Sequence, residues 1–246
     1  MGKSLKLEDK FSFSCHEKLA CFKKCCRDIN IFLTPFDVLR MKNELKITSG
    51  EFLTKYTHVL RAPHSGFPVV ILKMREDNLV CPFITDFGCQ VYHVRPWSCR
   101  MAPLEVRGVG EYGIAFDKSR CHGLNESKEW TVKEWMDNQG LTAYEEPEKH
   151  FGQIPLKIKL TGDKGLDQFM MEMILIACYD LDRFRTILTI LKKHPSLTEN
   201  ESEEKIKDAM DDDVALMKFA FEWLPIQLSN SDKVLRLKNT IVSCMS

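Results

Sequence analysis

Ten cysteines occur among the 246 residues, and eight of them lie in the first half of the chain. The eight are Cys15, Cys21, Cys25, Cys26, Cys81, Cys89, Cys99 and Cys121. The N-terminal segment has basic residues but no apolar stretch of the length that a secretory signal needs, so we expect the protein in the reducing cytoplasm. Clustered cysteines in that compartment are more often metal ligands or catalysts than partners in disulfides.

The spacing separates the thiols into a first group of four, from Cys15 to Cys26, and a second group of four, from Cys81 to Cys121. Three residues lie between Cys21 and Cys25, which is a usual spacing for two ligands of a tetrahedral ion. On extended backbone, adjacent side chains such as Cys25 and Cys26 diverge and cannot easily bind one small ion together, so they should serve different metals or only one of them should be a ligand. The eight thiols could hold two mononuclear sites, or one iron–sulfur cluster with cysteines left over.

Thiolate ligands need positive charge around them. Four thiolates and one divalent ion carry a net charge of about −2, which an apolar pocket tolerates only with cations nearby. Arg27 follows the first group, and Arg95 and Arg100 flank Cys99. Their N–H groups can donate hydrogen bonds to sulfur. The sequence therefore predicts a centre for zinc or iron, ligated by the cysteines and surrounded by these three arginines.

Part of the chain resembles the YkgJ family of cysteine-cluster proteins, zinc- or iron-chelating domains of the CxxCxxCC type. The resemblance lies in FSFSCHEKLACFKKCCRDINIFLTPFDVLRMK, CPFITDFGCQVYHVRPWSCRMAPLE and CHG, within residues 11–140. It implies metal ligands at Cys21, Cys25, Cys26, Cys81, Cys89 and Cys99, with Cys15 and Cys121 as additions. Flagellin lysine N-methylases contain a similar cysteine domain, so the resemblance also permits a role in methyl transfer.

Two classes of function follow. The first is a metal-binding protein that coordinates zinc or iron, with a metal ion and a protein as its candidate partners. The alternative is a metal-dependent enzyme, either an iron–sulfur oxidoreductase or a protein like the lysine N-methyltransferases, although the sequence has no glycine-rich nucleotide loop. Equal numbers of acidic and basic residues, 35 each, argue against nucleic acid as a partner. No apolar run reaches the roughly 20 residues that span a bilayer.

The N-terminal part is expected to contain short helices and hairpins. Thr34 with Asp37 and Thr48 with Glu51 are capping signals that predict two helices in succession. FPVVILKM and LVCPFI, separated by EDN, predict a β-hairpin that leads to Cys81, and VRGVGEYGIAFD predicts a second hairpin. The segment from Thr131 predicts a short helix stopped by a glycine at position 140.

The C-terminal part is expected to be helical. Residues 144–155 are charged and contain proline, which predicts a linker. Apolar residues at helical spacing predict one long helix over 164–193 and another over 199–224. Cys178 and Cys244 lie among apolar residues and are expected in the core. The predicted fold class is α+β, mainly helical with short β-hairpins around a cysteine-ligated metal centre. It comprises a metal-binding domain, residues 1–145, and a helical region, residues 146–246, packed on it.

Overall fold

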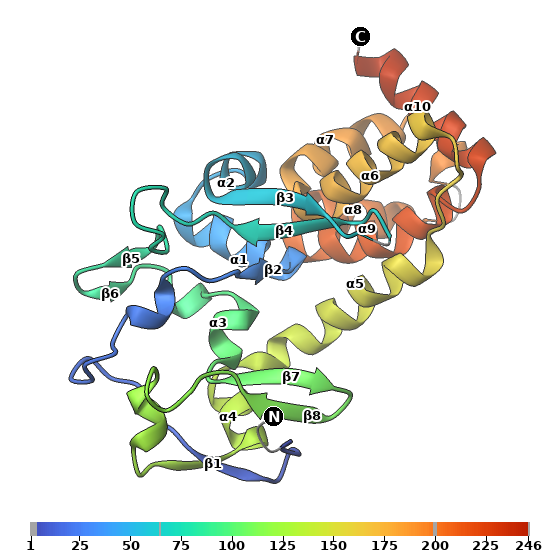
Figure 1. Ribbon diagram of the computed structural model, residues 1–246. Coiled ribbons are helices and arrows are strands. Elements are labelled where there is room, and N and C mark those ends of the chain that lie inside the picture. Colours follow the sequence, from blue (N-terminus) through green and yellow to red (C-terminus); the bar gives the residue numbers. More distant parts are fainter. Residues whose placement is uncertain (1–3, 64, 199–200, 246) are drawn as a thin grey trace. The chain divides into compact units, whose positions relative to one another are not determined.

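The structure is a computed structural model that describes residues 4–63, 65–198 and 201–245 (Figure 1). Contacts divide the chain into two compact units: unit 1 consists of Met1–Leu33 and Leu72–Glu145, and unit 2 of Thr34–Ile71 and Glu146–Ser246. Helices and short antiparallel strand pairs make up both, so the predicted α+β, mainly helical class is confirmed. The division into domains at residue 145 stays a prediction.

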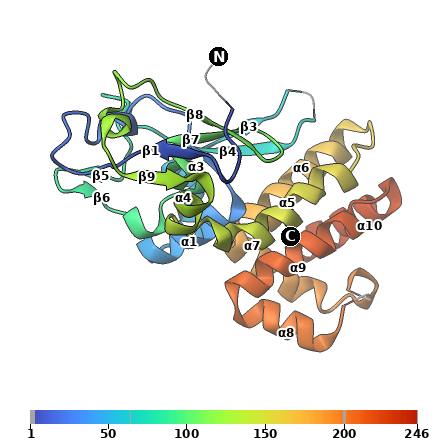
Figure 2. The same cartoon turned by 90° about the horizontal axis from the view of Figure 1, so that it is seen from below.

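Unit 1 is built from short elements joined by irregular loops. Its strands are β1 (Lys10–Ser12), β2 (Phe32–Leu33), β5 (Ile84–Thr85), β6 (Gly88–Cys89), β7 (Leu104–Gly108), β8 (Glu111–Ile114) and β9 (Glu129–Thr131). Its helices are η1 (Lys24–Cys26), η2 (Tyr92–Val94), α3 (Trp97–Met101), η3 (His122–Asn125), α4 (Val132–Asn138) and η4 (Leu141–Tyr144). The antiparallel pair β7–β8 is the predicted second hairpin. β1 pairs with β9, and both lie beside α4 (Figure 2).

The core of unit 1 is centred on Trp135 in α4. Its ring meets Phe11 and Phe13 edge-on, with centroids 6.2 and 5.2 Å away, and its indole N–H donates to the Met101 carbonyl. The predicted capping box at the start of α4 is present. The Thr131 side chain accepts from the Glu134 N–H, and the Glu134 carboxylate accepts from the Thr131 N–H. This packing fixes the N-terminal strand against α4.

Unit 2 contains most of the long helices. Its elements are α1 (Pro35–Leu45), α2 (Ser49–Tyr56), β3 (Thr57–Arg61), β4 (Pro68–Leu72), α5 (Glu145–Lys157), α6 (Lys164–Tyr179), α7 (Leu181–Leu191), η5 (Pro195–Leu197), α8 (Glu203–Asp211), α9 (Asp213–Gln227) and α10 (Ser231–Met245). The two predicted caps are confirmed: Thr34 forms a capping box with Asp37, and the Thr48 side chain accepts from the Glu51 N–H. Large side chains fill the bundle, among them Met170, Met173, Phe184, Phe219 and Trp223.

The predicted hairpin that joins FPVVILKM to LVCPFI is wrong. β4 pairs with β3, the strand that precedes it in the chain. The EDN turn does form, since the Arg75 N–H donates to the Val80 carbonyl, but Val80 then makes an isolated bridge with Arg27. A β-branched apolar run indicates a strand but does not specify which strand pairs with it. In the structure, the preceding segment THVLR (β3) forms the hydrogen bonds with β4 that we expected from LVCPFI.

The predicted linker over residues 144–155 is also wrong, because α5 covers Glu145–Lys157. Pro147 is the third residue of this helix, where a backbone N–H would have no partner within the helix. Pro155 lies in its last turn. The prolines therefore fall at the two ends of the helix rather than at its centre.

Each of the two long helices predicted near the C-terminus is a pair of helices. Asp180 separates α6 from α7, and its carboxylate accepts from the Arg183 N–H at 3.4 Å. Asp212 separates α8 from α9 and accepts from the Ala215 N–H at 2.8 Å. An aspartate between two apolar runs caps a new helix, whereas apolar periodicity alone continues through it. Residues 199 and 200, at the start of the second prediction, lie outside the described residues.

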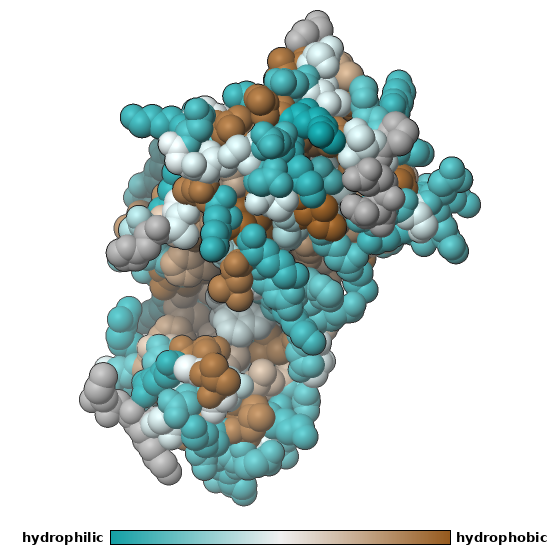
Figure 3. Space-filling view, turned by 90° about the vertical axis from the view of Figure 1, so that its right-hand side faces the viewer, coloured by the Kyte–Doolittle hydropathy of each residue, from teal (hydrophilic) through white to brown (hydrophobic). Residues whose placement is uncertain are grey.

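In the described part of the chain, no helix is long and apolar enough to cross a membrane. On the face drawn in Figure 3, hydrophobic side chains are exposed in small groups between hydrophilic ones. Such scattered groups are normal for a protein surface.

Candidate metal centre

All eight predicted ligands lie in unit 1, although they come from segments far apart in the chain. Cys15 and Cys21 lie in the loop after β1, Cys25 and Cys26 in η1, and Cys81 in the loop before β5. Cys89 ends β6, Cys99 lies in α3, and Cys121 directly precedes η3. The ten cysteines of the chain, all within its described part, form no disulfide. The site therefore has to be assembled by tertiary contacts between loops.

One set of contacts joins the loop after β1 to the start of η3. The Ser14 N–H donates to the Gly123 carbonyl at 3.0 Å, and the His122 N–H donates to the Cys21 sulfur at 3.3 Å. A Cβ atom at position 123 would lie 2.6 Å from the Ser14 carbonyl oxygen, so the close approach of the two segments requires glycine. The thiols in this set interact electrostatically with one another. We call them the Cys15 group: Cys15, Cys21, Cys25 and Cys121.

A second set of contacts joins η1 to the loop that carries Cys81. The Cys81 N–H donates to the Cys26 carbonyl at 2.8 Å, and the Cys81 carbonyl accepts from Ile84, which pairs with Cys89 across β5 and β6. The Cys26 thiol interacts electrostatically with Cys81 and Cys99, and Cys81 with Cys89. We call these thiols the Cys26 group: Cys26, Cys81, Cys89 and Cys99.

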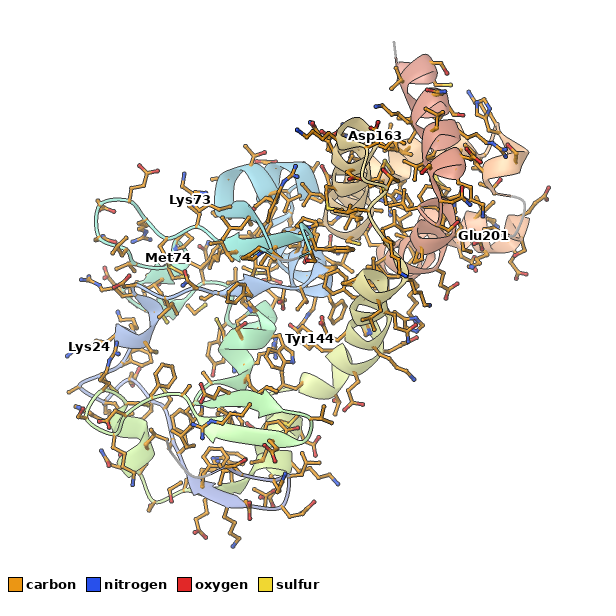
Figure 4. All side chains as sticks on the ribbon, turned by 45° about the vertical axis from the view of Figure 1, so that its right-hand side comes forward. Lys24, Lys73, Met74, Tyr144, Asp163 and Glu201 are labelled. Atoms are coloured by element: carbon orange, nitrogen blue, oxygen red, sulfur yellow. The ribbon has the colours of Figure 1, made fainter. Side chains whose placement is uncertain are left out.

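Cys25 and Cys26, one from each group, lie side by side in η1, whose first residue, Lys24, is labelled in Figure 4. Lys23, just before this turn, has φ of 67°, and its ammonium group donates to the Thr85 and Asp86 carbonyls at 3.2 and 2.9 Å. Lys23 thus ties η1 to the turn between β5 and β6. The Cys25 and Cys26 thiols are hydrogen-bonded to each other.

Crowding changes the acidity of the thiols. Desolvation, followed by repulsion from Cys25, Cys21 and Cys121, raises the pKa of Cys15 to about 11. Desolvation also raises the pKa values of Cys81, Cys89 and Cys121. The hydrogen bond from Cys26 has the opposite effect and lowers the pKa of Cys25 to about 7. So many thiols cannot ionise together unless a cation compensates their charge.

The three predicted arginines occupy different positions. Desolvation raises the pKa values of Cys15 and Cys89, and the charge of Arg95 opposes this rise at both thiols. The buried Arg100 donates to the backbone carbonyls of His93, Arg95 and Gln139, so it joins the segment before α3 to the end of α4. Arg27 forms the bridge to Val80 through its backbone, and its role beside sulfur stays a prediction.

Arg75 was missed by the sequence prediction. Its guanidinium donates to the Pro82 and Ile84 carbonyls at 3.1 Å each, and its charge opposes the rise that desolvation causes in the pKa of Cys81. Five residues lie between Arg75 and Cys81 in the sequence, and the turn that they form brings the two together. A basic residue before a turn is too common a pattern to have indicated this role.

The donor chemistry fits a thiophilic ion such as zinc or iron, because thiolates are preferred ligands of both. In the described residues, no three His, Cys, Asp or Glu side chains are arranged so that they could hold a metal ion. The sulfurs are gathered without converging on one point. Zinc would require four of them at about 2.3 Å from a common centre. The cysteine side chains would have to rotate to reach this arrangement, and the short elements and loops around them leave room for such rotation.

The two remaining cysteines differ from each other. Cys178 is completely buried in α6, as predicted for a core residue. Cys244 is exposed in α10, and its sulfur lies 3.7 Å from His194 Nε2, so the prediction that it is buried is wrong. Both lie in unit 2, apart in the chain from the eight clustered thiols.

A comparison with known protein families finds a match over the region that contains the clustered cysteines. Residues 14–133 match the model of the CxxCxxCC family, described as "Putative zinc- or iron-chelating domain". This segment is similar to that family over the region that carries the clustered cysteines. The match begins one residue before Cys15 and ends after Cys121, so it contains all eight clustered thiols and neither Cys178 nor Cys244. No curated protein and no solved structure matches the chain.

Proposed function

We propose that this protein binds zinc or iron through its clustered cysteines. The observation that carries the proposal is the gathering of eight thiols from distant segments into one compact unit without a disulfide. The match to the CxxCxxCC family covers the same thiols and supports a chelating role. Ten cysteines without a disulfide also suit a reducing compartment such as the cytoplasm.

Charge supports a metal ion over bare thiols. Mutual repulsion and desolvation oppose ionisation of Cys15, and Cys121 is affected by the same neighbours. A bound cation would stabilise the thiolates and remove this opposition, since ligand thiols are deprotonated when they bind metal. Arg95 and Arg75 would offset the negative charge that remains on the metal–thiolate centre.

An iron–sulfur cluster is the main alternative to zinc, because four thiolates are also the ligand set of [4Fe–4S] clusters. It would open the further alternative of an enzyme, either an oxidoreductase or a protein related to lysine N-methyltransferases. Visible absorption separates these cases: iron–sulfur protein purified without oxygen is brown, whereas the zinc protein is colourless. Iron–sulfur absorption would favour the oxidoreductase.

Elemental analysis of the full chain, purified under anaerobic and reducing conditions, tests the proposal. We expect stoichiometric zinc or iron in the wild type. Cys21→Ser, Cys25→Ser and Cys89→Ser should each lower the metal content and the melting temperature together. Cys178→Ser and Cys244→Ser are matched controls outside the cluster, and their metal content should equal that of the wild type. Wild-type protein that binds neither metal, or equal metal loss in the controls, would overturn the proposal.

A further inference from the structure

The order of the thiols along the chain differs from their grouping in space. Sequence spacing places Cys26 with Cys15, Cys21 and Cys25, and it places Cys121 with the later cysteines. Two hydrogen bonds reverse both assignments. The Cys81 N–H donates to the Cys26 carbonyl, and the His122 N–H donates to the Cys21 sulfur. Cys26 and Cys121 therefore exchange groups.

The backbone around η1 allows the exchange. Lys23 adopts the left-handed conformation before this single turn, and Arg27 returns to extended backbone after it. The chain leaves η1 through the bridge between Arg27 and Val80, which carries Cys26 towards the Cys81 loop. The Cys25 and Cys26 thiols are hydrogen-bonded to each other, but their further neighbours differ: Cys15 and Cys121 for Cys25, and Cys81 and Cys99 for Cys26. Cys25 can thus serve the side that Cys121 occupies while Cys26 serves the other.

We infer that the eight thiols form two separate four-sulfur sites, one made by the Cys15 group and one by the Cys26 group, with adjacent Cys25 and Cys26 ligating different centres. This inference rests on the proposed metal-binding function. Each site takes one thiophilic centre, either a zinc ion or an iron–sulfur cluster. One peptide bond links the two sites directly, and the charge of Arg95 acts on Cys15 of one group and on Cys89 of the other.

Paired substitutions test the grouping with zinc as the probe. The full-length wild type, loaded with Zn²⁺ under anaerobic reducing conditions, should bind about two zinc ions per chain, one for each four-thiolate site. The double variant Cys21→Ser/Cys121→Ser damages one spatial group and should retain about half of the zinc. The double variant Cys21→Ser/Cys26→Ser damages both groups and should retain almost none.

The same two variants give the opposite result if the sites follow the sequence order. Cys21→Ser/Cys26→Ser would then retain half of the zinc, and Cys21→Ser/Cys121→Ser would lose all of it. Complete loss in both variants would indicate a single shared centre. Either result overturns the inference while leaving metal binding intact. Wild-type protein without zinc affinity would instead contradict the proposed function itself.

A second measurement needs no substitution and so does not depend on how the variants fold. Zinc is withdrawn stepwise from the wild type with a chelator, and newly released thiols are alkylated and identified by peptide mass spectrometry. Cys26 should become reactive together with Cys81, Cys89 and Cys99, and Cys121 together with Cys21. Release of Cys26 with Cys21, or of all eight thiols in one step, would contradict two separate sites.

Discussion

At the scale of single residues, Cys25 is the thiol whose chemistry the structure defines most sharply. The hydrogen bond from the Cys26 thiol lowers its pKa from 9.0 to about 7. At pH 7 about half of Cys25 would be thiolate, compared with about 1% for an unshifted thiol. Because the thiolate is the nucleophile, Cys25 should react faster than an ordinary cysteine in metal-free protein.

We therefore predict that alkylation of Cys25 by iodoacetamide, in reduced metal-free protein, rises with pH through a midpoint near 7. Cys26→Ala removes the hydrogen-bond donor and should move the midpoint towards 9.0, the unshifted value. Peptide mapping across a pH series measures both midpoints. Cys244→Ala serves as the control, since that cysteine lies in unit 2. An unchanged Cys25 midpoint in Cys26→Ala would show that the hydrogen bond does not govern its acidity.

Arg95 is the second residue with a distinct expected effect. Its guanidinium donates to the Tyr92 carbonyl at 2.9 Å and to the Gln139 side chain, and it lies 3.9 Å from the centroid of the Tyr92 ring. These contacts hold its charge where it acts on both Cys15 and Cys89. Loss of a group beside metal ligands typically weakens metal binding about 10- to 100-fold.

Arg95→Gln should accordingly weaken zinc binding about tenfold or more at both groups of thiols. Arg75→Gln should weaken it at the Cys26 group alone, since Arg75 acts on Cys81. Competition with a chromophoric chelator measures the two zinc affinities. Arg107→Gln, which removes a salt bridge to Glu105, is the control. If Arg95→Gln affected no more sites than Arg75→Gln, Arg95 would not act on both groups.

At the scale of secondary structure elements, local signals were sufficient where a few adjacent residues determine the outcome. The caps at Thr34, Thr48 and Thr131 form because a side-chain oxygen meets an N–H three residues later. The partner of a strand is a competition between distant segments, so β4 paired with β3 against expectation. The grouping of the thiols depends on contacts of the same kind, because hydrogen bonds between loops join Cys26 to Cys81 and Cys21 to His122, and no sequence spacing indicates either contact.

The contact of α5 with the start of α1 also escaped the sequence, and it buries Glu148. The Thr34 hydroxyl is hydrogen-bonded to its carboxylate, whereas Oε1 is buried and has no hydrogen-bond partner among the described residues. Desolvation, opposed by that hydrogen bond and reinforced by the nearby Asp37 carboxylate, raises the pKa of Glu148 to about 7. This carboxyl group is therefore most stable in its protonated form.

The raised pKa of Glu148 predicts how stability depends on pH. Between pH 4.5, the ordinary value, and about 7, folded protein keeps a proton that unfolded protein releases. The contribution of Glu148 to stability is complete below pH 4.5 and is lost as the pH rises to about 7. Glu148→Gln should flatten this decline and stabilise the protein at pH 8 by about 1–3 kcal/mol, a range reduced for the partial exposure of the carboxyl group.

Urea unfolding of the full chain at pH 5, 6, 7 and 8 measures the effect of Glu148→Gln. Glu145→Gln is a matched control, since Glu145 is an exposed glutamate at the first position of the same helix. Its stability curve should parallel that of the wild type. A Glu148→Gln variant that loses stability equally at every pH would show that the carboxyl group is not protonated in the folded protein.

At the scale of the whole molecule, the two units differ in the interactions that can stabilise each of them. Unit 2 has a bundle core and a buried ion network, in which Lys42 lies 2.8 Å from Asp213 and 3.4 Å from Asp182. In unit 1, α4 has seven residues and most strand pairs have two or three residues per strand. Isolated two-stranded pairs and helices this short are marginally stable in water. Unit 1 should therefore depend on its metal, whereas unit 2 should not.

Hydrogen exchange before and after chelation tests that difference. Structural zinc contributes on the order of 10–16 kcal/mol, which is comparable to or greater than the whole free energy of unfolding of a typical domain. Its removal should therefore expose the amides of residues 4–33 and 72–144 to exchange. Amides of 146–245 should stay protected, and adding zinc back should restore the rest. Residues 34–71 are decisive: their protection should persist if they fold with unit 2, as their contacts indicate, and should be lost if a domain ends at residue 145. Uniform loss across the chain would mean that metal and bundle fold as one unit.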